Sequence, residues 1–195
     1  MQQDSSNEPV TDLRRRRSVT TRRKIADALR ALVEEGAVRP TAEQVAARAG
    51  VGLRTVFRHF DDMETLYREI VSGVDALVIP VVTREMTATG WQERLLECCK
   101  VLADHYEGLT SLYQTSQVHR HSSGYLDEQL HRYAQMQREM LRGVLPKDRL
   151  GDKALLAALG LVLSMDAWMH LRREQGLSPA AALKATRCAV AALSR

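Results

Sequence analysis

The segment Thr41-Ala-Glu-Gln-Val-Ala-Ala-Arg-Ala-Gly50-Val-Gly-Leu-Arg-Thr-Val-Phe-Arg-His-Phe60 decides the fold of this chain. Thr41 with Gln44 three residues later forms a capping box, which predicts the first turn of a helix. The apolar stripe of this helix consists of Ala42, Val45, Ala46 and Ala49. Gly50 can adopt the left-handed conformation that ends a helix. The next apolar stripe consists of Leu53, Val56, Phe57 and Phe60. Two short helices joined by a tight turn, a helix-turn-helix, are therefore predicted.

The second predicted helix has a polar face opposite its apolar stripe. This solvent-facing side consists of Arg54, Thr55, Arg58 and His59. Hydrogen-bond donors, acceptors and positive charge on one exposed helix face suit the major groove of DNA, where base edges and phosphates lie within reach. The alternative is an ordinary helical hairpin with a solvated polar face, which produces the same short pattern.

The composition indicates an all-α protein with a basic N-terminal part. The 195 residues include only 11 Gly and 5 Pro, and aromatic residues make up 5%. From Leu13 to Phe60 the chain has 12 Lys and Arg against 4 Asp and Glu, whereas the net charge of the whole chain is +4. The positive charge therefore coincides with the helix-turn-helix, as expected for a protein that binds a polyanion.

A run of basic residues precedes the helix-turn-helix. We expect residues 1–17 to form a flexible arm in which Arg15, Arg16 and Arg17 contact DNA phosphates or enter a minor groove. The alternative for this arm is a solubilising tail. A helix from about Val19 to Glu35, ended by Gly36, then completes a homeodomain-like domain of three helices over residues 18–62.

Residues 63–195 are expected to form a helical domain that binds a ligand and dimerises. Asp61 and Asp62 can cap a long helix from Met63 that ends or bends near Pro80. Further helices are predicted over 91–106, 109–118 and 124–145. The candidate ligand-binding residues on them are Trp91, Leu95, Tyr106, Tyr113, Tyr133, Met136 and Met140. Residues of these types at helical spacing equally fit an ordinary core.

The last two predicted helices differ from the others in composition. The helix over 154–171 is apolar on nearly every side, and such a helix must be covered all round. The final helix opens with Ser178 and Pro179 and is rich in alanine. We expect these two helices to form a homodimer interface as a four-helix bundle, the alternative being the core of a monomer.

The order of these parts resembles the tetracycline-repressor (TetR) family of transcription regulators, most specifically over residues 25–66. The resemblance implies that a homodimer binds a palindromic operator in double-stranded DNA, represses transcription, and is released by a small-molecule effector that is largely apolar. The positions that the resemblance assigns to DNA binding are Thr41, Arg54, Thr55, Phe57, Arg58 and His59. We also expect Gly52 and Leu53, at the start of the second helix, to lie at the DNA. Three residues depart from the family pattern: Gly52 replaces a capping Ser or Thr, Phe57 a tyrosine, and Met63 a lysine.

Other functional classes find little support in the sequence. Motifs of nucleotide-binding, hydrolase and metalloprotease sites are absent, so we expect no enzyme and no cofactor. The histidines at 105, 119, 121 and 131 lack metal-ligand spacing. Cys98, Cys99 and Cys188 are expected to be buried thiols, and the lack of a signal peptide or membrane span predicts a cytoplasmic protein. The competing interpretation is an architectural protein that binds DNA of any sequence without an effector.

Overall fold

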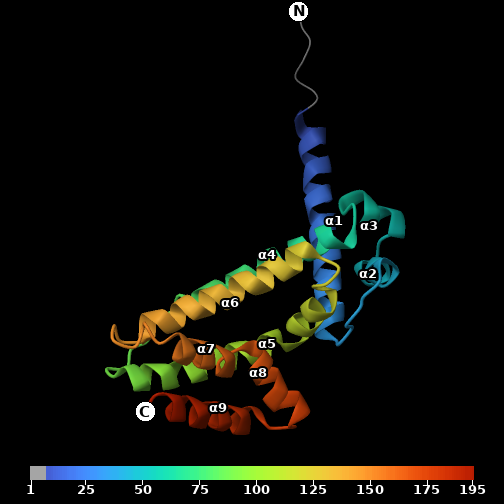
Figure 1. The fold of residues 1–195 in the computed structure, drawn as a ribbon. Helices are drawn as coiled ribbons and strands as arrows, with labels where there is room; N and C mark the ends of the chain where they lie inside the picture. The colour runs from blue at the N-terminus through green and yellow to red at the C-terminus, as the bar shows by residue number, and fades with distance from the viewer. Residues whose placement is uncertain (1–7) are drawn as a thin grey trace, which may run out of the picture.

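The computed structural model describes the backbone of residues 8–195, with side chains from Arg15 onward except at position 72, and this part of the chain contains helices and no strand. The helices are α1 (Glu8–Glu34), α2 (Ala42–Ala49), α3 (Leu53–His59), α4 (Met63–Val82), α5 (Trp91–His119), α6 (Gly124–Val144), α7 (Lys153–Val162), α8 (Met165–Met169) and α9 (Pro179–Leu193). A π-helical turn at His170–Glu174 follows α8. The predicted all-α fold is confirmed, and Figure 1 shows α1, α2 and α3 at one end of the molecule.

The three N-terminal helices form the predicted helix-turn-helix unit. The capping box is present, since the Thr41 hydroxyl accepts from the Gln44 N–H at 3.3 Å and the Gln44 side-chain oxygen accepts from the Thr41 N–H at 2.9 Å. Gly50 ends α2 with a φ of 65°. The core of the unit is formed by Ile25, Leu29, Val33, Val45, Val56 and Phe60, joined by Leu66 at the start of α4. Helix α1 therefore braces α2 and α3, as the sequence predicted.

Helix α1 begins much earlier than expected. The prediction of a flexible arm over residues 1–17 is wrong for residues 8–17, which are helical, while residues 1–7 lie outside the described residues. Pro9 lies in the first turn, where backbone N–H groups make no hydrogen bond within the helix, so the lack of an N–H in proline costs nothing there. Arginine, which follows in a run, is a good helix former. The N-terminal half of α1 consequently projects away from the rest of the fold (Figure 1).

The C-terminal helices differ from prediction at two places. Residues 91–119 form one helix, α5, because Gly108 alone does not interrupt it. The helix expected over 154–171 instead breaks after Val162, and the Ser164 hydroxyl caps α8 by accepting from the Ala167 N–H at 3.1 Å. Asp62 caps α4 as predicted, accepting from the Thr65 N–H at 2.7 Å, and Pro80 lies in its last turns.

The C-terminal domain has its own core, in which α5 packs against α9 and α4 packs against α6. Its buried side chains include Leu95, Cys98, Leu102, Leu141, Leu159 and Val190. Cys98 and Cys99 are buried as expected, but Cys188 is exposed, so the expectation of three buried thiols is wrong for that residue. Within residues 8–195 no single helix is long and apolar enough to cross a membrane. The consecutive helices Lys153–Val162 and Met165–Glu174 meet the length and composition criteria only when they are taken together, and they are bent by 41° relative to each other.

Candidate functional site

Helix α3 presents a mixed apolar and basic face to solvent. Val56 and Phe60 are 2% and 1% exposed, whereas Leu53 and Phe57 are 37% and 48% exposed. The predicted apolar stripe is therefore wrong for Leu53 and Phe57, which lie beside Arg54 on the outer side. Successive side chains on a helix are 100° apart around its axis, and the seven-residue α3 is covered by α1 and α2 on one side only. This side does not accommodate all four residues of the predicted stripe.

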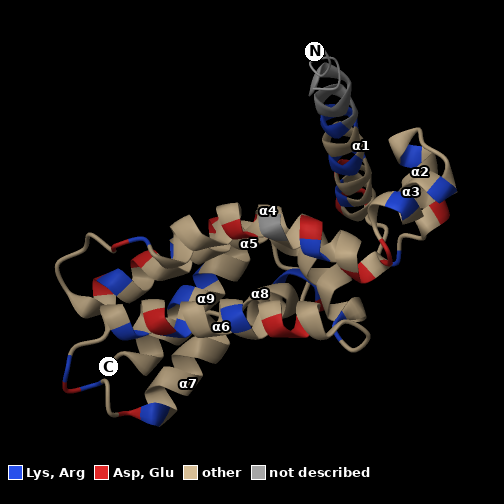
Figure 2. Ribbon diagram, turned by 90° about the horizontal axis from the view of Figure 1, so that it is seen from above, with Lys and Arg blue, Asp and Glu red and all other residues tan. Residues whose placement is uncertain are grey.

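Most of the predicted DNA-binding residues are exposed. This set consists of Arg15, Arg16, Arg17, Thr41, Gly52, Leu53, Arg54, Phe57 and Arg58, while Thr55 and His59 are half-buried. Figure 2 shows Lys and Arg along α1 and on α2 and α3. The structure thus brings the residues of α2 and α3 onto one end of the molecule and places the three arginines of the former arm on a helix.

His59 differs from the arginines beside it because it is electrically neutral near pH 7. Burial, reinforced by the positive charges of Arg58 and Arg22, holds the pKa of the His59 imidazole below its ordinary value of 6.5. A neutral imidazole can exchange a hydrogen bond but supplies no charge to a phosphate. The basic character of the α3 face therefore comes from Arg54 and Arg58.

Arg22 is a residue of this site that the sequence reasoning missed. Its guanidinium donates to the backbone carbonyl of His59 at 2.7 Å and to the Glu69 carboxylate at 3.0 Å. The same group lies over the Phe60 ring, 4.3 Å from its centroid. Arg22 thus connects α1 to the carboxyl end of α3 and to α4. It fixes the position of α3 and does not add to the exposed basic surface. Only its place in a run of basic residues was visible in the sequence.

A cavity of about 260 Å³ lies between α4, α5 and α6 and reaches the junction of α7 and α8. Three of the predicted ligand-binding residues, Tyr106, Tyr113 and Tyr133, line it. The other four are not among the lining residues. Leu95 and Met140 are buried in the C-terminal core, Trp91 packs against that core, and Met136 is half-buried. Helical periodicity alone did not distinguish the cavity-facing side of α5 and α6 from the core-facing side.

The walls of the cavity are mainly aliphatic and extend into the DNA-binding domain. Its aliphatic lining comprises Val33, Ile70, Val71, Val74, Val78, Val82, Leu102, Leu109, Leu112, Leu126, Leu130, Ala134 and Met165. Val33 of α1 and Val71 of α4 belong at the same time to the core of the helix-turn-helix unit. Tyr67, also in the lining, stacks against His119 at a centroid distance of 4.9 Å. A molecule in the cavity would touch the base of the DNA-binding domain directly.

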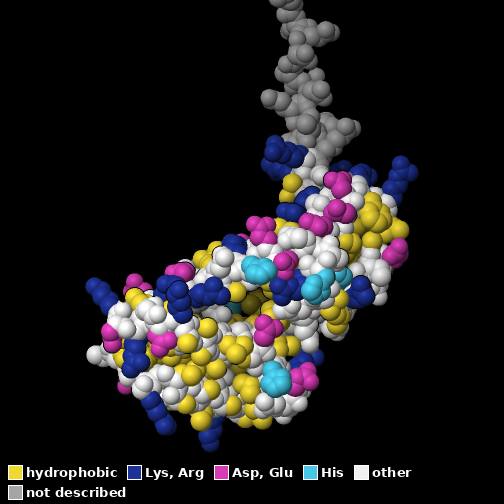
Figure 3. All heavy atoms as spheres, in the orientation of Figure 1, with side chains coloured by type: hydrophobic (Ala, Val, Ile, Leu, Met, Phe, Trp, Pro, Cys, Tyr) yellow, Lys and Arg dark blue, Asp and Glu magenta, His cyan; other side chains and the backbone are white. Residues whose placement is uncertain are grey.

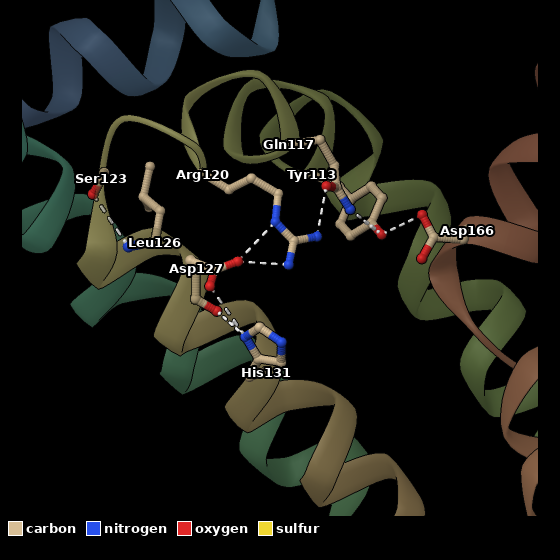
Figure 4. A network of polar contacts seen from close by, with 8 residues as sticks. All are labelled: Tyr113, Gln117, Arg120, Ser123, Leu126, Asp127, His131 and Asp166. Carbon is tan, nitrogen blue, oxygen red and sulfur yellow. Dashed lines mark hydrogen bonds and ion pairs between the residues drawn. The ribbon is translucent and has the colours of Figure 1, made fainter.

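A chain of polar side chains crosses one side of the cavity (Figure 4). Arg120 donates to Asp127 of α6 at 2.9 and 2.6 Å and to the Gln117 oxygen at 3.1 Å. The Gln117 amide donates to the Tyr113 hydroxyl, which in turn donates to Asp166 of α8 at 2.6 Å. Figure 3 shows a hollow on the corresponding face, with hydrophobic side chains inside and histidine, acidic and basic side chains around it. Helices α5, α6 and α8 are thereby connected across the opening.

No arrangement for metal chemistry is present among the described residues, since no group of three or more His, Cys, Asp or Glu side chains could hold a metal ion. Burial lowers the pKa of His105 in the cavity wall, which keeps its ring neutral near pH 7. Burial also raises the pKa of the Tyr106 and Tyr113 hydroxyls, so both remain protonated. These three side chains therefore meet the cavity uncharged.

Comparison with known proteins agrees with this arrangement. Residues 25–70 match the family described as "Bacterial regulatory proteins, tetR family". A TetR transcriptional regulator from Rhodococcus sp. RHA1 is similar in structure, with a TM-score of 0.55 and 20% identity over 89% of this chain and 96% of that one. A protein assigned to the TetR family from Mesorhizobium loti MAFF303099 has a TM-score of 0.50 and 19% identity over 91% and 96% of the two chains. At such identities the likeness shows a shared fold. No curated protein matches the chain in sequence.

A helix-turn-helix unit with an exposed basic face, seated on a helical domain, defines the class of DNA-binding transcriptional regulators. Within that class, the matched segment covers α2, α3 and parts of the two helices that flank them. Residues 25–70 carry the DNA-binding domain of the TetR family, and the chain shares the fold of two TetR-family regulators over about 90% of its length.

Proposed function

We propose that this protein is a repressor that binds a palindromic operator as a homodimer and is released from it by a small molecule. The observation that carries the proposal is the position of the cavity. Its wall includes Val33 and Val71, which are also core residues of the DNA-binding domain. A ligand that favours a different placement of α1 and α4 would weaken DNA binding, and DNA would weaken ligand binding by the same factor.

DNA contact is assigned to the exposed face of α3 and to the N-terminus of α2. We propose that Arg54 and Arg58 reach base edges and phosphates of the major groove, with Leu53 and Phe57 beside them in contact with apolar edges such as thymine methyl groups. Thr41, Thr55, His59 and the Gly52 backbone would complete this surface. Arg15, Arg16 and Arg17 would contact phosphates from the helical extension of α1.

The surface of α7, α8 and α9 supports the homodimer. Leu161 is 67% exposed, the highest value among the exposed large apolar side chains. It lines a shallow hollow together with the apolar residues Val162, Ala167, Leu171, Ala185 and Ala189 and the polar residues Asp166, His170 and Thr186. Small side chains let a second helix pair approach closely, so we propose that two copies join α7–α8 and α9 in a four-helix bundle. Two recognition helices would then face successive major grooves.

A footprinting experiment on DNA beside its own gene tests the proposal. A regulator protects one palindromic sequence, and sedimentation of the complex gives two protein chains per site. Uniform protection of all sequences, lost steeply with salt, would instead establish the alternative of an architectural binder. Deletion of residues 1–17 measures the α1 extension separately: if its arginines contact phosphates, affinity falls for every sequence and the salt dependence becomes shallower.

A further inference from the structure

We propose that the cavity binds a primary or other protonated amine carried on an aliphatic body. This inference rests on the proposed function, because it specifies the class of effector, but it concerns binding alone and can be tested without DNA. It is carried by the charges and by the hydrogen-bonding groups that line the cavity.

The charges of the lining leave a single carboxylate without a cation. Apart from histidines, the charged side chains among the described lining residues are Arg120 and Asp166. Arg120 is engaged by Asp127 at 2.9 and 2.6 Å, and His131 lies beside the same carboxylate at 3.4 Å. Asp166 is exposed to solvent, and its partner is the neutral Tyr113 hydroxyl. A cationic ligand therefore meets an uncompensated negative charge, whereas a carboxylate ligand meets no available positive one.

Five of the seven hydroxyl groups among the described lining residues offer acceptors rather than donors, the other two being those of Tyr67 and Thr115. A hydroxyl has one proton and two lone pairs, so a hydroxyl whose proton is committed can only accept from a ligand. Five lining hydroxyls have committed protons: Tyr106 to the Leu163 carbonyl at 2.8 Å, Tyr113 to Asp166 at 2.6 Å, Tyr133 to Asp75 at 2.7 Å, Ser116 to the Leu112 carbonyl at 2.9 Å, and Ser164 to the Leu161 carbonyl at 2.7 Å. The cavity is consequently matched to a ligand that donates hydrogen bonds.

Two further lining atoms fit the same ligand. The Gln129 oxygen and Nε2 of His105 are buried and have no hydrogen-bond partner among the described residues. An amide oxygen accepts, and a neutral imidazole can accept at one nitrogen. An ammonium group has three donors and no acceptor, so it complements this lining better than an alcohol, which adds an acceptor, or a carboxylate, which only accepts.

The size of the cavity limits the body of the ligand. A volume of about 260 Å³ corresponds to roughly nine water-sized units at about 30 Å³ each. An eight-carbon chain with one polar head has nearly the same number of non-hydrogen atoms. The aliphatic side chains of α4, including Ile70, Val74 and Val78, would cover such a chain, and Asp166 would face its head group.

Three ligands of matched length test the charge preference. Calorimetric titration of the full chain at pH 7.5 with n-octylammonium, 1-octanol and octanoate should give affinity in that order, with octanoate weakest. An amine of this kind is protonated at pH 7.5, as a lysine side chain is. Equal or tighter binding of 1-octanol or octanoate would overturn the inference, and so would the absence of octylammonium binding.

Asp166→Asn tests the assigned carboxylate, with Asp104→Asn as the charge-matched control. Asp104 is exposed on α5, pairs with Lys100 and does not line the cavity. The Asp166 variant should weaken octylammonium binding by about threefold to fivefold, because an ion pair with an exposed carboxylate is weak, and should change 1-octanol binding by less than about twofold. An effect no larger than that of the control, or an equal loss for both ligands, would refute the assignment. If octylammonium binds as expected but leaves the operator complex intact, the ligand class stands and the proposed release mechanism fails.

Discussion

Replacement of Arg22 by alanine should destabilise the protein by about 2 kcal/mol. The guanidinium makes a charge-assisted hydrogen bond of 2.7 Å to the His59 carbonyl, a group at the carboxyl end of α3. Such bonds contribute about 1.5–3 kcal/mol, and a cation over an aromatic ring about 0.5–1 kcal/mol. The pair with Glu69 adds little because the two side chains are 38% and 37% exposed. The Arg22 side chain is partly exposed to solvent, so the combined contribution of the hydrogen bond and the cation–π contact lies near the lower end of these ranges.

Urea unfolding followed by circular dichroism measures this effect. With a slope of about 2 kcal/mol/M, a loss of 2 kcal/mol lowers the unfolding midpoint by about 1 M. Arg23→Ala is the matched control, because this neighbouring side chain is 84% exposed and its ion pair with Asp27 is 3.9 Å long. We expect the control to change stability by less than about 0.5 kcal/mol. Equal midpoints for the two variants would refute the idea that Arg22 fastens α1 to α3 and α4.

Three further predictions concern the two functional surfaces and the core. Arg54→Ala and Arg58→Ala should each weaken operator binding by roughly 1–3 kcal/mol, measured by gel shift, and no change for either would exclude α3 as the docking face. The pKa of His105 lies below 6.5 in the folded chain, so the unfolded chain binds more protons as pH falls below 6.5. Stability should therefore decrease on acidification through this range, and less so in His105→Asn; calorimetry that finds the same slope would contradict this. Burial raises the pKa of Cys98 to about 12 and of Cys99 to about 11. Both thiols should resist a thiol reagent until urea unfolds the chain, and rapid labelling of either in the native state would show that the C-terminal core opens.

The DNA-binding half was largely predictable because its signals are local. A capping box and a left-handed glycine act within a few residues, so Thr41, Gln44 and Gly50 define α2 without reference to the rest of the chain. The burial of Ile25, Leu29 and Val45 followed from periodicity in the same way. By contrast, which side of α3 stays exposed depends on how α1 and α2 cover it, and Phe57 was consequently assigned to the wrong side.

The ligand cavity depended on tertiary structure. A helix pattern identifies apolar positions, but whether those positions meet another helix or leave a space depends on helix lengths and crossing geometry. Tyr106 lines the cavity and Leu95, on the same helix, lies in the core. The contacts of Asp166 likewise arise from the break between α7 and α8, which the sequence pattern did not predict.

The sequence by itself determined the all-α fold, the helix-turn-helix and the concentration of positive charge in the N-terminal part, because capping, periodicity and composition are properties of neighbouring residues. The tertiary structure alone decided that Arg22 connects α1 to α3 and α4, and that one carboxylate, Asp166, stands without a cation at the cavity. Each of these facts depends on residues far apart in the chain or on the packing that surrounds them, which no local pattern records.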